Sequence, residues 1–221
     1  MNFNNRPIGV FDSGLGGLTS LKRIKALLPN ENIIYSGDTA RTPYGSKSVD
    51  TINRFSQQIT EFLLNRDVKI IAIACNTVSA ASLNILKQIN PQIPFLGIIE
   101  PIVASLPNFI QDKSIVAVIG TEVTINSKTY EKVIRQKLPK VKVVSRACPL
   151  FVTLIEEGLH DAPVMDSHIR YYLDDFIKEN QPDYLILGCT HYPLIKHKIE
   201  KIYPGIVLLD PAFSQAEKIE E

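Results

Sequence analysis

Two cysteines stand at matching places in this sequence, each at the end of a short apolar run. Cys75 closes the run in "KIIAIACNTVSA", and Cys189 closes the run in "YLILGCTHYP". A single cysteine in such a run is most often a small buried apolar residue. Here, however, each is followed by small polar residues that can begin a helix and offer backbone N–H groups to an anion. A thiol whose pKa is lowered by one or two units exchanges protons near neutral pH, so the pair is a candidate for acid–base chemistry.

Each cysteine also has a candidate proton partner. His191 lies two residues after Cys189, and Asp12 closes another apolar run, near which Cys75 is expected. Cys148, in "RACPLF", has no comparable surroundings, and we interpret it as structural.

The acidic pair Glu156 and Glu157 lies in "CPLFVTLIEEGLH". Such a pair at a helix end is usually solvated. A role beside His191 requires the fold to bring the two together.

A glycine-rich turn follows Asp12 in "GVFDSGLGGLTSL". It predicts a strand, a tight turn and a helix whose first N–H groups hold a carboxylate or phosphate, or alternatively a plain turn that Asp12 or Ser13 caps. The turn partly matches a dinucleotide fingerprint, with Asp38 placed as the ribose-binding acid. Thr19 occupies the position of the third glycine, which argues against that interpretation.

The loop "DTARTPYGSKS" contains Tyr44 and Gly45. It is either an ordinary surface turn or a lid that closes over a ligand, with Tyr44 as a hydrogen-bonding group.

Eight short apolar runs alternate with amphipathic segments along the chain. The expected strands are 8–11, 32–36, 70–74, 95–98, 115–119, 142–145, 184–187 and 206–209, and the expected helices include 20–28, 51–66, 128–138, 166–179 and one starting near Phe213. Strands that are apolar throughout and joined by helices indicate an α/β fold with parallel sheets covered on both faces. In such folds ligands bind beyond the carboxyl ends of the strands, where Cys75 and Cys189 lie. The two halves echo each other weakly, so we expect two similar α/β lobes that the chain joins near Glu100-Pro101 and Pro204-Gly205.

The bulk composition narrows the class of protein. The chain has 221 residues and a net charge of +1, with no block of like charge, so nucleic-acid or membrane binding is not expected. No apolar run approaches the roughly 20 residues of a membrane helix, and the first residues lack the pattern of a signal peptide. Three cysteines make no disulfide framework and fit no zinc spacing. We therefore expect a reduced cytoplasmic protein.

Five segments in this order, "FDSGLGGLT", "TPYGSKS", "ACNTVSA", "CPLFVTLIEEG" and "GCTHYPLI", resemble the glutamate racemases, within the broader aspartate/glutamate racemase superfamily. The resemblance runs from Ile8 to about Ala216. It implies two lobes with the active site between them, residues 1–99 plus 206–221 forming the first and 100–205 the second. It also implies an enzyme that interconverts L- and D-glutamate without a cofactor, supplies D-glutamate for peptidoglycan, and forms a homodimer.

The resemblance also assigns roles by position. Cys75 and Cys189 would face opposite sides of the substrate's α-carbon. Asp12 and His191 would assist them, and Glu156 rather than Glu157 would be a further helper. The implied substrate-binding residues are Ser13, Tyr44, Gly45, Asn76, Thr77, Thr121, Thr124 and Thr190.

Other functions remain open on the sequence alone. Aspartate, one methylene shorter than glutamate, could be the substrate, because the sequence gives no pocket depth. A protein that binds an amino acid without turnover would share the pocket. A nucleotide-binding oxidoreductase would use the glycine-rich turn and Asp38.

Overall fold

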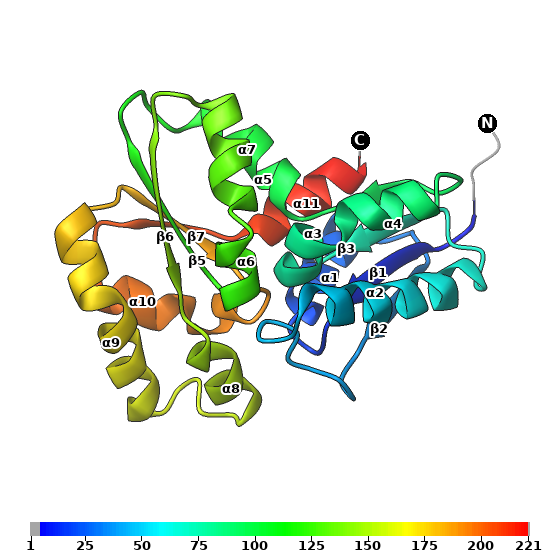
Figure 1. The fold of residues 1–221 in the computed structure, drawn as a ribbon, viewed down its shortest axis with the longest axis horizontal. Coiled ribbons are helices and arrows are strands. Elements are labelled where there is room, and N and C mark those ends of the chain that lie inside the picture. Colours follow the sequence, from blue (N-terminus) through cyan, green and yellow to red (C-terminus); the bar gives the residue numbers. More distant parts are fainter. Residues whose placement is uncertain (1–4, 221) are drawn as a thin grey trace.

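The computed structural model describes residues 5–220 and contains two four-stranded parallel sheets. Residues 1–4 and 221 lie outside the described residues. They belong to the expected first lobe, and residues 1–4 are part of the segment considered as a signal peptide. The first sheet has the order β2 (Ile33–Gly37), β1 (Ile8–Asp12), β3 (Ile70–Ile73), β4 (Phe95–Leu96), and the second β6 (Lys142–Ala147), β5 (Ile115–Gly120), β7 (Tyr184–Gly188), β8 (Val207–Leu209). The two orders are the same when β5 is matched to β1. The expected fold of two similar α/β lobes is confirmed (Figure 1).

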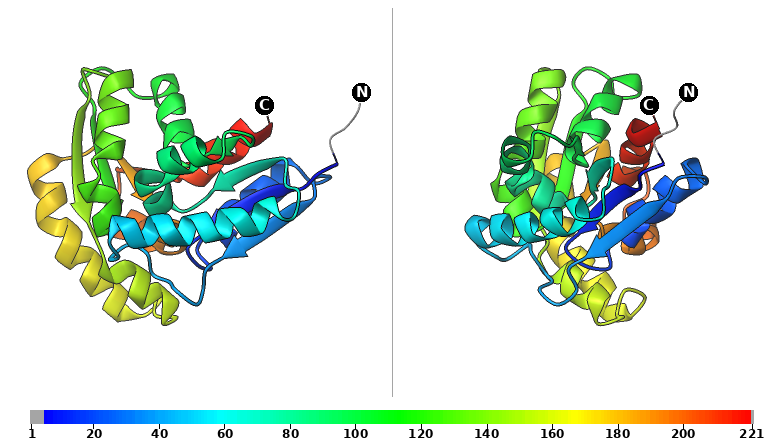
Figure 2. Two further views of the ribbon diagram at one scale, coloured as in Figure 1. Left: turned by 45° about the vertical axis from the view of Figure 1, so that its right-hand side comes forward. Right: turned by 90° about the vertical axis from the view of Figure 1, so that its right-hand side faces the viewer.

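Helices cover both faces of each sheet, as the uniformly apolar strands predict. The α-helices are α1 (Leu18–Leu27), α2 (Val49–Leu64), α3 (Asn76–Ala81), α4 (Leu83–Ile89), α5 (Ile99–Ser105), α6 (Glu122–Asn126), α7 (Thr129–Lys137), α8 (Leu150–Glu156), α9 (Pro163–Asn180), α10 (Lys196–Ile202) and α11 (Pro211–Glu220), with 3₁₀ turns at Leu106–Asn108 and Tyr192–Ile195. Buried side chains of α1 and α11 meet one face of the first sheet, and those of α2 and α4 meet the other. The second sheet is covered by α5 and α7 on one face and by α8, α9 and α10 on the other (Figures 1 and 2).

The long helix α2 shows how local sequence sets an element. Ser48 caps its first turn, because its Oγ accepts a hydrogen bond from the backbone N–H of Thr51 at 3.3 Å. Ile52, Ile59 and Leu63, at helical spacing, are buried against the first sheet.

The first expected crossing, Glu100-Pro101, lies in helix α5, between the last strand of the first sheet and the first strand of the second. The second expected crossing differs from the structure. The chain does not return at Pro204-Gly205, because β8 pairs in parallel with β7 and extends the second sheet. The return follows β8, and α11 then packs against α1 and α5 (Figure 2). The division into folding domains at 99/100 and 205/206 stays a prediction.

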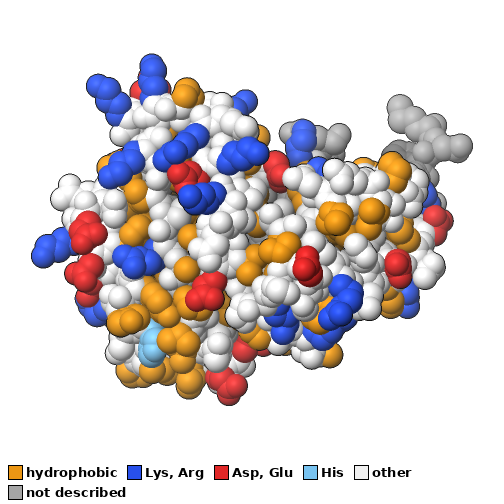
Figure 3. Space-filling model, in the orientation of Figure 1, with side chains coloured by type: hydrophobic (Ala, Val, Ile, Leu, Met, Phe, Trp, Pro, Cys, Tyr) orange, Lys and Arg blue, Asp and Glu red, His pale blue; other side chains and the backbone are white. Residues whose placement is uncertain are grey.

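The surface shown in Figure 3 carries basic and acidic side chains intermingled, in keeping with the net charge of +1. Within residues 5–220, no helix is long and apolar enough to cross a membrane.

Candidate active site

A small cavity lies between the lobes, where the carboxyl ends of β1, β3, β5 and β7 meet. Its lining residues are Ser13, Thr42, Pro43, Tyr44, Gly45, Cys75, Asn76, Thr77, Thr121, Val152, Cys189, Thr190 and His191. In each sheet the direction in which successive strands are added reverses at one point. This point lies between β1 and β3 in the first sheet and between β5 and β7 in the second. Such a reversal point is where open α/β sheets bind ligands. Cys75 follows β3 and Cys189 follows β7, so the two cysteines occupy topologically equivalent positions and line one cavity.

The cavity is closed in this structure. Its volume of about 10 Å³ is close to the minimum needed for one water molecule. An amino acid requires the lobes, or the loops that bridge them, to move apart.

Cys75 lies at the start of helix α3 and is almost fully buried. Its Sγ donates to the hydroxyl of Ser13 at 3.5 Å. Burial and, after it, the charge of Asp12 raise the pKa of Cys75 to about 11, although hydrogen bonds from Ser13 and the Val78 backbone N–H act in the opposite direction.

Cys189 lies beside a histidine and a carboxylate. Its Sγ is 3.8 Å from Nδ1 of His191, and Nε2 of His191 is 2.5 Å from Oε1 of Glu156. Of the two adjacent acids, Glu156 is therefore the one that contacts His191. Glu157, at the carboxyl end of α8, is exposed. Burial raises the pKa of Cys189 above its ordinary range, although backbone N–H groups of His191 and Tyr192 favour the thiolate.

The expectation of lowered thiol pKa values is wrong for this closed state. Backbone N–H groups that follow each cysteine act to lower the thiol pKa, the direction that the sequence predicts. Their effect is smaller than the cost of placing a thiolate in a cavity that excludes water. Both thiols are therefore protonated in the closed cavity.

Asp12 is fully buried and holds the glycine-rich turn together. Its Oδ2 accepts hydrogen bonds from the backbone N–H groups of Gly14 and Gly17, both at 3.0 Å. Its Oδ1 accepts one from the Thr190 hydroxyl at 3.3 Å, across the two lobes. Burial raises the pKa of Asp12, and the charge of His191 and these hydrogen bonds partly offset the effect. Asp12 therefore closes the turn at Gly17, the N-cap residue of helix α1.

The same turn leaves no room for a dinucleotide phosphate. A Cβ added at Gly16 would lie 2.6 Å from side-chain atoms of His191 and Thr190. The Asp38 carboxylate, the expected ribose ligand, accepts from the Tyr44 hydroxyl and lies 2.6 Å from Nε of Arg41. The space at the glycine-rich turn and the carboxylate of Asp38 are thus both taken up by other side chains of the protein.

The loop that carries Tyr44 and Gly45 is part of the cavity wall. Tyr44 is buried, and its hydroxyl donates a hydrogen bond to Asp38. The loop is therefore not an ordinary surface turn, because Tyr44 forms part of the cavity wall. The carbonyl of Gly45 accepts a hydrogen bond from the Val123 backbone N–H of the other lobe at 3.2 Å.

Three threonines join the lobes on one side of the cavity. The Thr77 hydroxyl lies 3.0 Å from that of Thr121 and 3.4 Å from that of Thr124. Thr121 also caps α6 by accepting from the Thr124 backbone N–H. Thr121 and Thr77 line the cavity, whereas Thr124 lies behind them.

The structure thus brings ten of the thirteen sequence-predicted site residues into the cavity wall. The three others, Asp12, Glu156 and Thr124, each contact a wall residue directly. Sequence reasoning missed Thr42, Pro43 and Val152, although the first two lie in the quoted loop. It also missed Tyr130, whose hydroxyl donates to Oδ1 of Asn76 at 2.6 Å and which looks like an ordinary core residue of α7.

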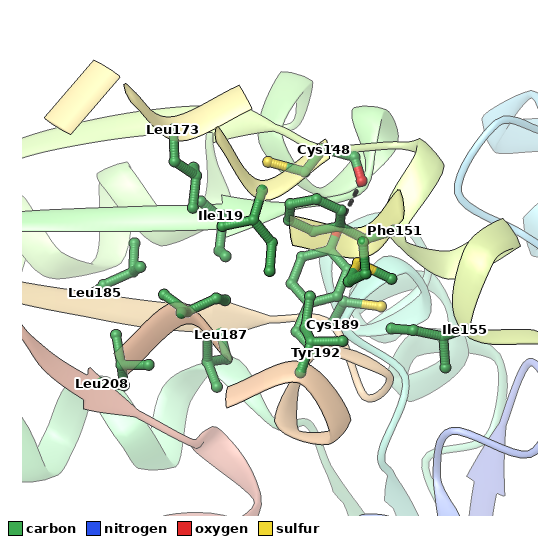
Figure 4. Close-up of a cluster of buried hydrophobic side chains, with 14 of the residues drawn as sticks. Ile119, Cys148, Phe151, Ile155, Leu173, Leu185, Leu187, Cys189, Tyr192 and Leu208 are labelled. Atoms are coloured by element: carbon green, nitrogen blue, oxygen red, sulfur yellow. Dashed lines mark hydrogen bonds between the residues drawn. The ribbon is translucent and has the colours of Figure 1, made fainter. Parts of the chain in front are cut away.

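The surroundings of Cys148 differ from those of the other two cysteines. It is buried in the apolar cluster of the second lobe, where its carbonyl accepts a hydrogen bond from Tyr192 at 2.9 Å (Figure 4). Cys189 lies at the edge of the same cluster and reaches the cavity. Among residues 5–220, no group of three or more His, Cys, Asp or Glu side chains is arranged to hold a metal ion.

Fold and site together define a class of two-lobed α/β proteins in which each lobe presents a cysteine, from the end of its third strand, to a shared cavity. The family model of Asp/Glu/Hydantoin racemase matches residues 12–219. The chain belongs to this family.

Similar proteins agree with this assignment. A glutamate racemase of Geobacter metallireducens is 48% identical over 217 residues, 98% of this chain and 79% of the relative. The crystal structure of glutamate racemase from Francisella tularensis in complex with D-glutamate has 44% identity and a TM-score of 0.91, covering 99% of this chain and 81% of that one. The aspartate racemase of Picrophilus torridus shares the fold, with a TM-score of 0.64 and 18% identity over 97% of this chain and 92% of that one.

Proposed function

We propose that this protein interconverts L- and D-glutamate by proton transfer at the α-carbon, with Cys75 and Cys189 as the two acid–base groups. The observation that carries the proposal is the placement of these two thiols, one from each lobe, on a single cavity. Racemisation must remove a proton from one face of a carbon and return a proton to the other. Two fixed groups on opposite sides can do this without either one moving around the substrate.

Each turnover transfers two protons. In the L-to-D direction, the Cys189 thiolate takes the α-proton, and the electron pair of the broken C–H bond delocalises into the substrate's carboxylate. The Cys75 thiol then donates its proton to the opposite face and becomes the thiolate. In the D-to-L direction the roles reverse.

The substrate itself supports thiolate formation. The closed cavity keeps both thiols protonated because burial disfavours the charged thiolate. The α-ammonium group of glutamate brings a positive charge next to the sulfur atoms, which favours the thiolate over the thiol.

His191 and Glu156 are suited to take the proton from Cys189. With Nε2–H directed at the Glu156 carboxylate, Nδ1 of His191 is left facing Sγ as an acceptor. A thiolate–imidazolium pair formed in this way is stabilised by the carboxylate behind it, the arrangement of an activated nucleophile with its base and orienting acid. Glu156 is partly exposed and offers a route for protons to solvent.

The remaining wall residues are suited to hold an amino acid. Hydroxyl and amide groups of Ser13, Asn76, Thr77, Thr121 and Thr190 can donate to carboxylates and accept from an ammonium group. Glutamate is preferred over aspartate because the relatives at 44–48% identity carry the name glutamate racemase, whereas the aspartate racemase shares the fold alone.

The test is a chiral assay of the purified protein with both enantiomers of glutamate and of aspartate. We expect racemisation of glutamate with kcat/KM at least about tenfold above that for aspartate, a difference of about 1.4 kcal/mol in transition-state binding. Turnover of aspartate alone would overturn the proposed substrate. Binding of D-glutamate without turnover would instead identify a non-catalytic binding protein.

We further propose that the enzyme is a cytoplasmic homodimer whose D-glutamate enters peptidoglycan. Expression of this chain should remove the requirement for added D-glutamate in a bacterial D-glutamate auxotroph, and the double variant Cys75→Ala/Cys189→Ala should not. Sedimentation velocity on the purified protein should give about twice the mass of one chain.

A further inference from the structure

The side-chain amide of Asn76 has one group engaged and one group free. Oδ1 accepts the hydrogen bond from Tyr130, while Nδ2 is buried and has no hydrogen-bond partner among the described residues. Asn76 lines the cavity and is 2% exposed. A buried N–H donor without a partner costs about 1–3 kcal/mol, so this group requires an explanation, and a ligand in the cavity would supply the missing acceptor.

Tyr130 connects the two cysteine-bearing strand ends. Its ring is buried in the second lobe and packs beside Gly188, where an added Cβ would lie 3.4 Å from Cε2 of Tyr130. Gly188 directly precedes Cys189. The hydroxyl of Tyr130 reaches into the first lobe, to Asn76, which directly follows Cys75.

We propose that Tyr130 is a positioning residue that fixes the Asn76 amide with its N–H groups toward the cavity, ready to bind the substrate's carboxylate. The inference rests on the proposed function and adds a determinant of substrate affinity from helix α7. Tyr130 does not line the cavity and acts only through Asn76.

The chemistry of the pair fits this role. Without Tyr130, Oδ1 and Nδ2 of Asn76 are nearly equal in shape, and rotation of the amide would present an acceptor to an anionic substrate. Burial raises the pKa of Tyr130 well above its ordinary value, so the hydroxyl keeps its proton at any working pH. A permanently protonated hydroxyl at 2.6 Å from Oδ1 holds the amide in one orientation.

A double-mutant cycle tests the inference. Tyr130→Phe keeps the ring and removes only the hydroxyl. We expect kcat/KM for glutamate to fall about tenfold, mainly through KM, because the lost contact serves the bound substrate and transition state alike. In the Asn76→Ala background the same change should alter kcat/KM less than about twofold, since the group that Tyr130 positions is gone.

The matched control is Tyr184→Phe. Tyr184 also donates its hydroxyl to a protein oxygen, the carbonyl of Phe109 at 3.0 Å, but at the end of β7 far from Cys189. Its kcat/KM should equal that of the native protein. An equal loss of kcat/KM from Tyr130→Phe in both backgrounds would show that Tyr130 has a merely structural role. Native kcat/KM in Tyr130→Phe would show that its hydroxyl has no role in the reaction. Either result overturns the inference.

Calorimetric binding of D-glutamate to the native protein and the three cycle variants separates this inference from the proposed function. A native protein that racemises glutamate but shows no coupling between Tyr130 and Asn76 overturns the inference alone. A native protein that binds D-glutamate, shows the coupling in Kd and does not racemise it overturns the proposed function alone. A native protein that neither binds nor racemises glutamate overturns both.

Discussion

The two cysteines have unequal surroundings although they occupy equivalent strand ends. Cys75 faces a single hydroxyl, that of Ser13, whereas Cys189 faces the His191–Glu156 pair. Both are protonated in the closed cavity, because burial dominates their pKa values. In the proposed mechanism, bound substrate is therefore needed to create the base, and Cys189 has the more direct proton acceptor.

The first prediction concerns the thiols themselves. Cys75→Ser or Cys189→Ser should lower kcat/KM for glutamate by at least about a thousandfold, because a serine hydroxyl is too weak an acid to replace a group whose acid–base contribution is of that order. The loss should be equal in both directions, since enantiomers have equal free energies. Cys148→Ala, outside the cavity, should keep native kcat/KM and lower only Tm. Racemisation at the native rate by either serine variant would end the two-thiol proposal.

The second prediction separates the adjacent acids. Glu156→Gln removes the charge behind His191 and should lower kcat/KM about ten- to hundredfold, the effect of a hydrogen bond to a charged group worth about 1.5–3 kcal/mol. Glu157→Gln, one residue later and exposed, should have no measurable effect. Equal effects of the two substitutions on steady-state kinetics would remove Glu156 from the mechanism.

At the residue scale, the sequence predicted the members of the site better than their contacts. Asn76, Thr77 and Thr190 lie next to the cysteines, so any fold that places the cysteines also places them. Tyr130 is 54 residues from Asn76 and has the spacing of a helical core residue, so only the packing of the two lobes reveals its hydroxyl contact. The thiol pKa direction was also beyond the sequence, because it depends on how completely the cavity excludes water.

At the scale of elements, the strands were predictable because most are short, strongly apolar runs, β6 being the most polar of them. The long helices α2 and α9 were predictable from their spacing of buried residues. The bounds of helices α3, α6 and α8 were not, because five to seven residues hold too few turns to show a period. The last strand was predicted, but its pairing with β7 was not, since that pairing leaves no local signal in the sequence.

The turn between β1 and α1 carries the third prediction. Gly16→Ala would force its Cβ to within 2.6 Å of side-chain atoms of His191 and Thr190, so these two side chains beside Cys189 must shift. We expect kcat/KM to fall more than about tenfold, with about 1–3 kcal/mol lost from the free energy of unfolding.

The control for this change is Gly205→Ala. Gly205 has φ of +105° and nothing within 4 Å of an added Cβ, so alanine there is strained without touching the site. It should lower Tm by a few degrees through a strain of about 1–3 kcal/mol while keeping native kcat/KM. A Gly16→Ala enzyme with native kinetics would show that the turn does not position His191.

At the scale of the whole molecule, two lobes of one topology are joined across the cavity by small polar contacts. Thr190 reaches Asp12, the Val123 N–H reaches Gly45, and Thr77 reaches Thr121. A cavity of about 10 Å³ cannot admit glutamate while these contacts hold. Substrate entry therefore requires some of them to open.

The fourth prediction follows from this closure. Amide hydrogen exchange of Val123, whose N–H bonds across the lobes to Gly45, should be fast in the free protein and markedly slower with saturating D-glutamate. The Ala117 amide, within β5 in the centre of the second sheet, should exchange equally slowly in both states. Slow exchange of Val123 without ligand and no change on binding would contradict opening at this contact.

The central claim is that separate thiols remove and return the α-proton. The most direct test is the conversion of protiated L-glutamate in heavy water, with the isotopic content of the first D-glutamate measured by mass spectrometry at low conversion. Because the donating thiol carries solvent deuterium, the D-glutamate should contain one α-deuterium from the first turnovers, while the unreacted L-glutamate stays protiated. D-glutamate that retains the original α-hydrogen would contradict the claim.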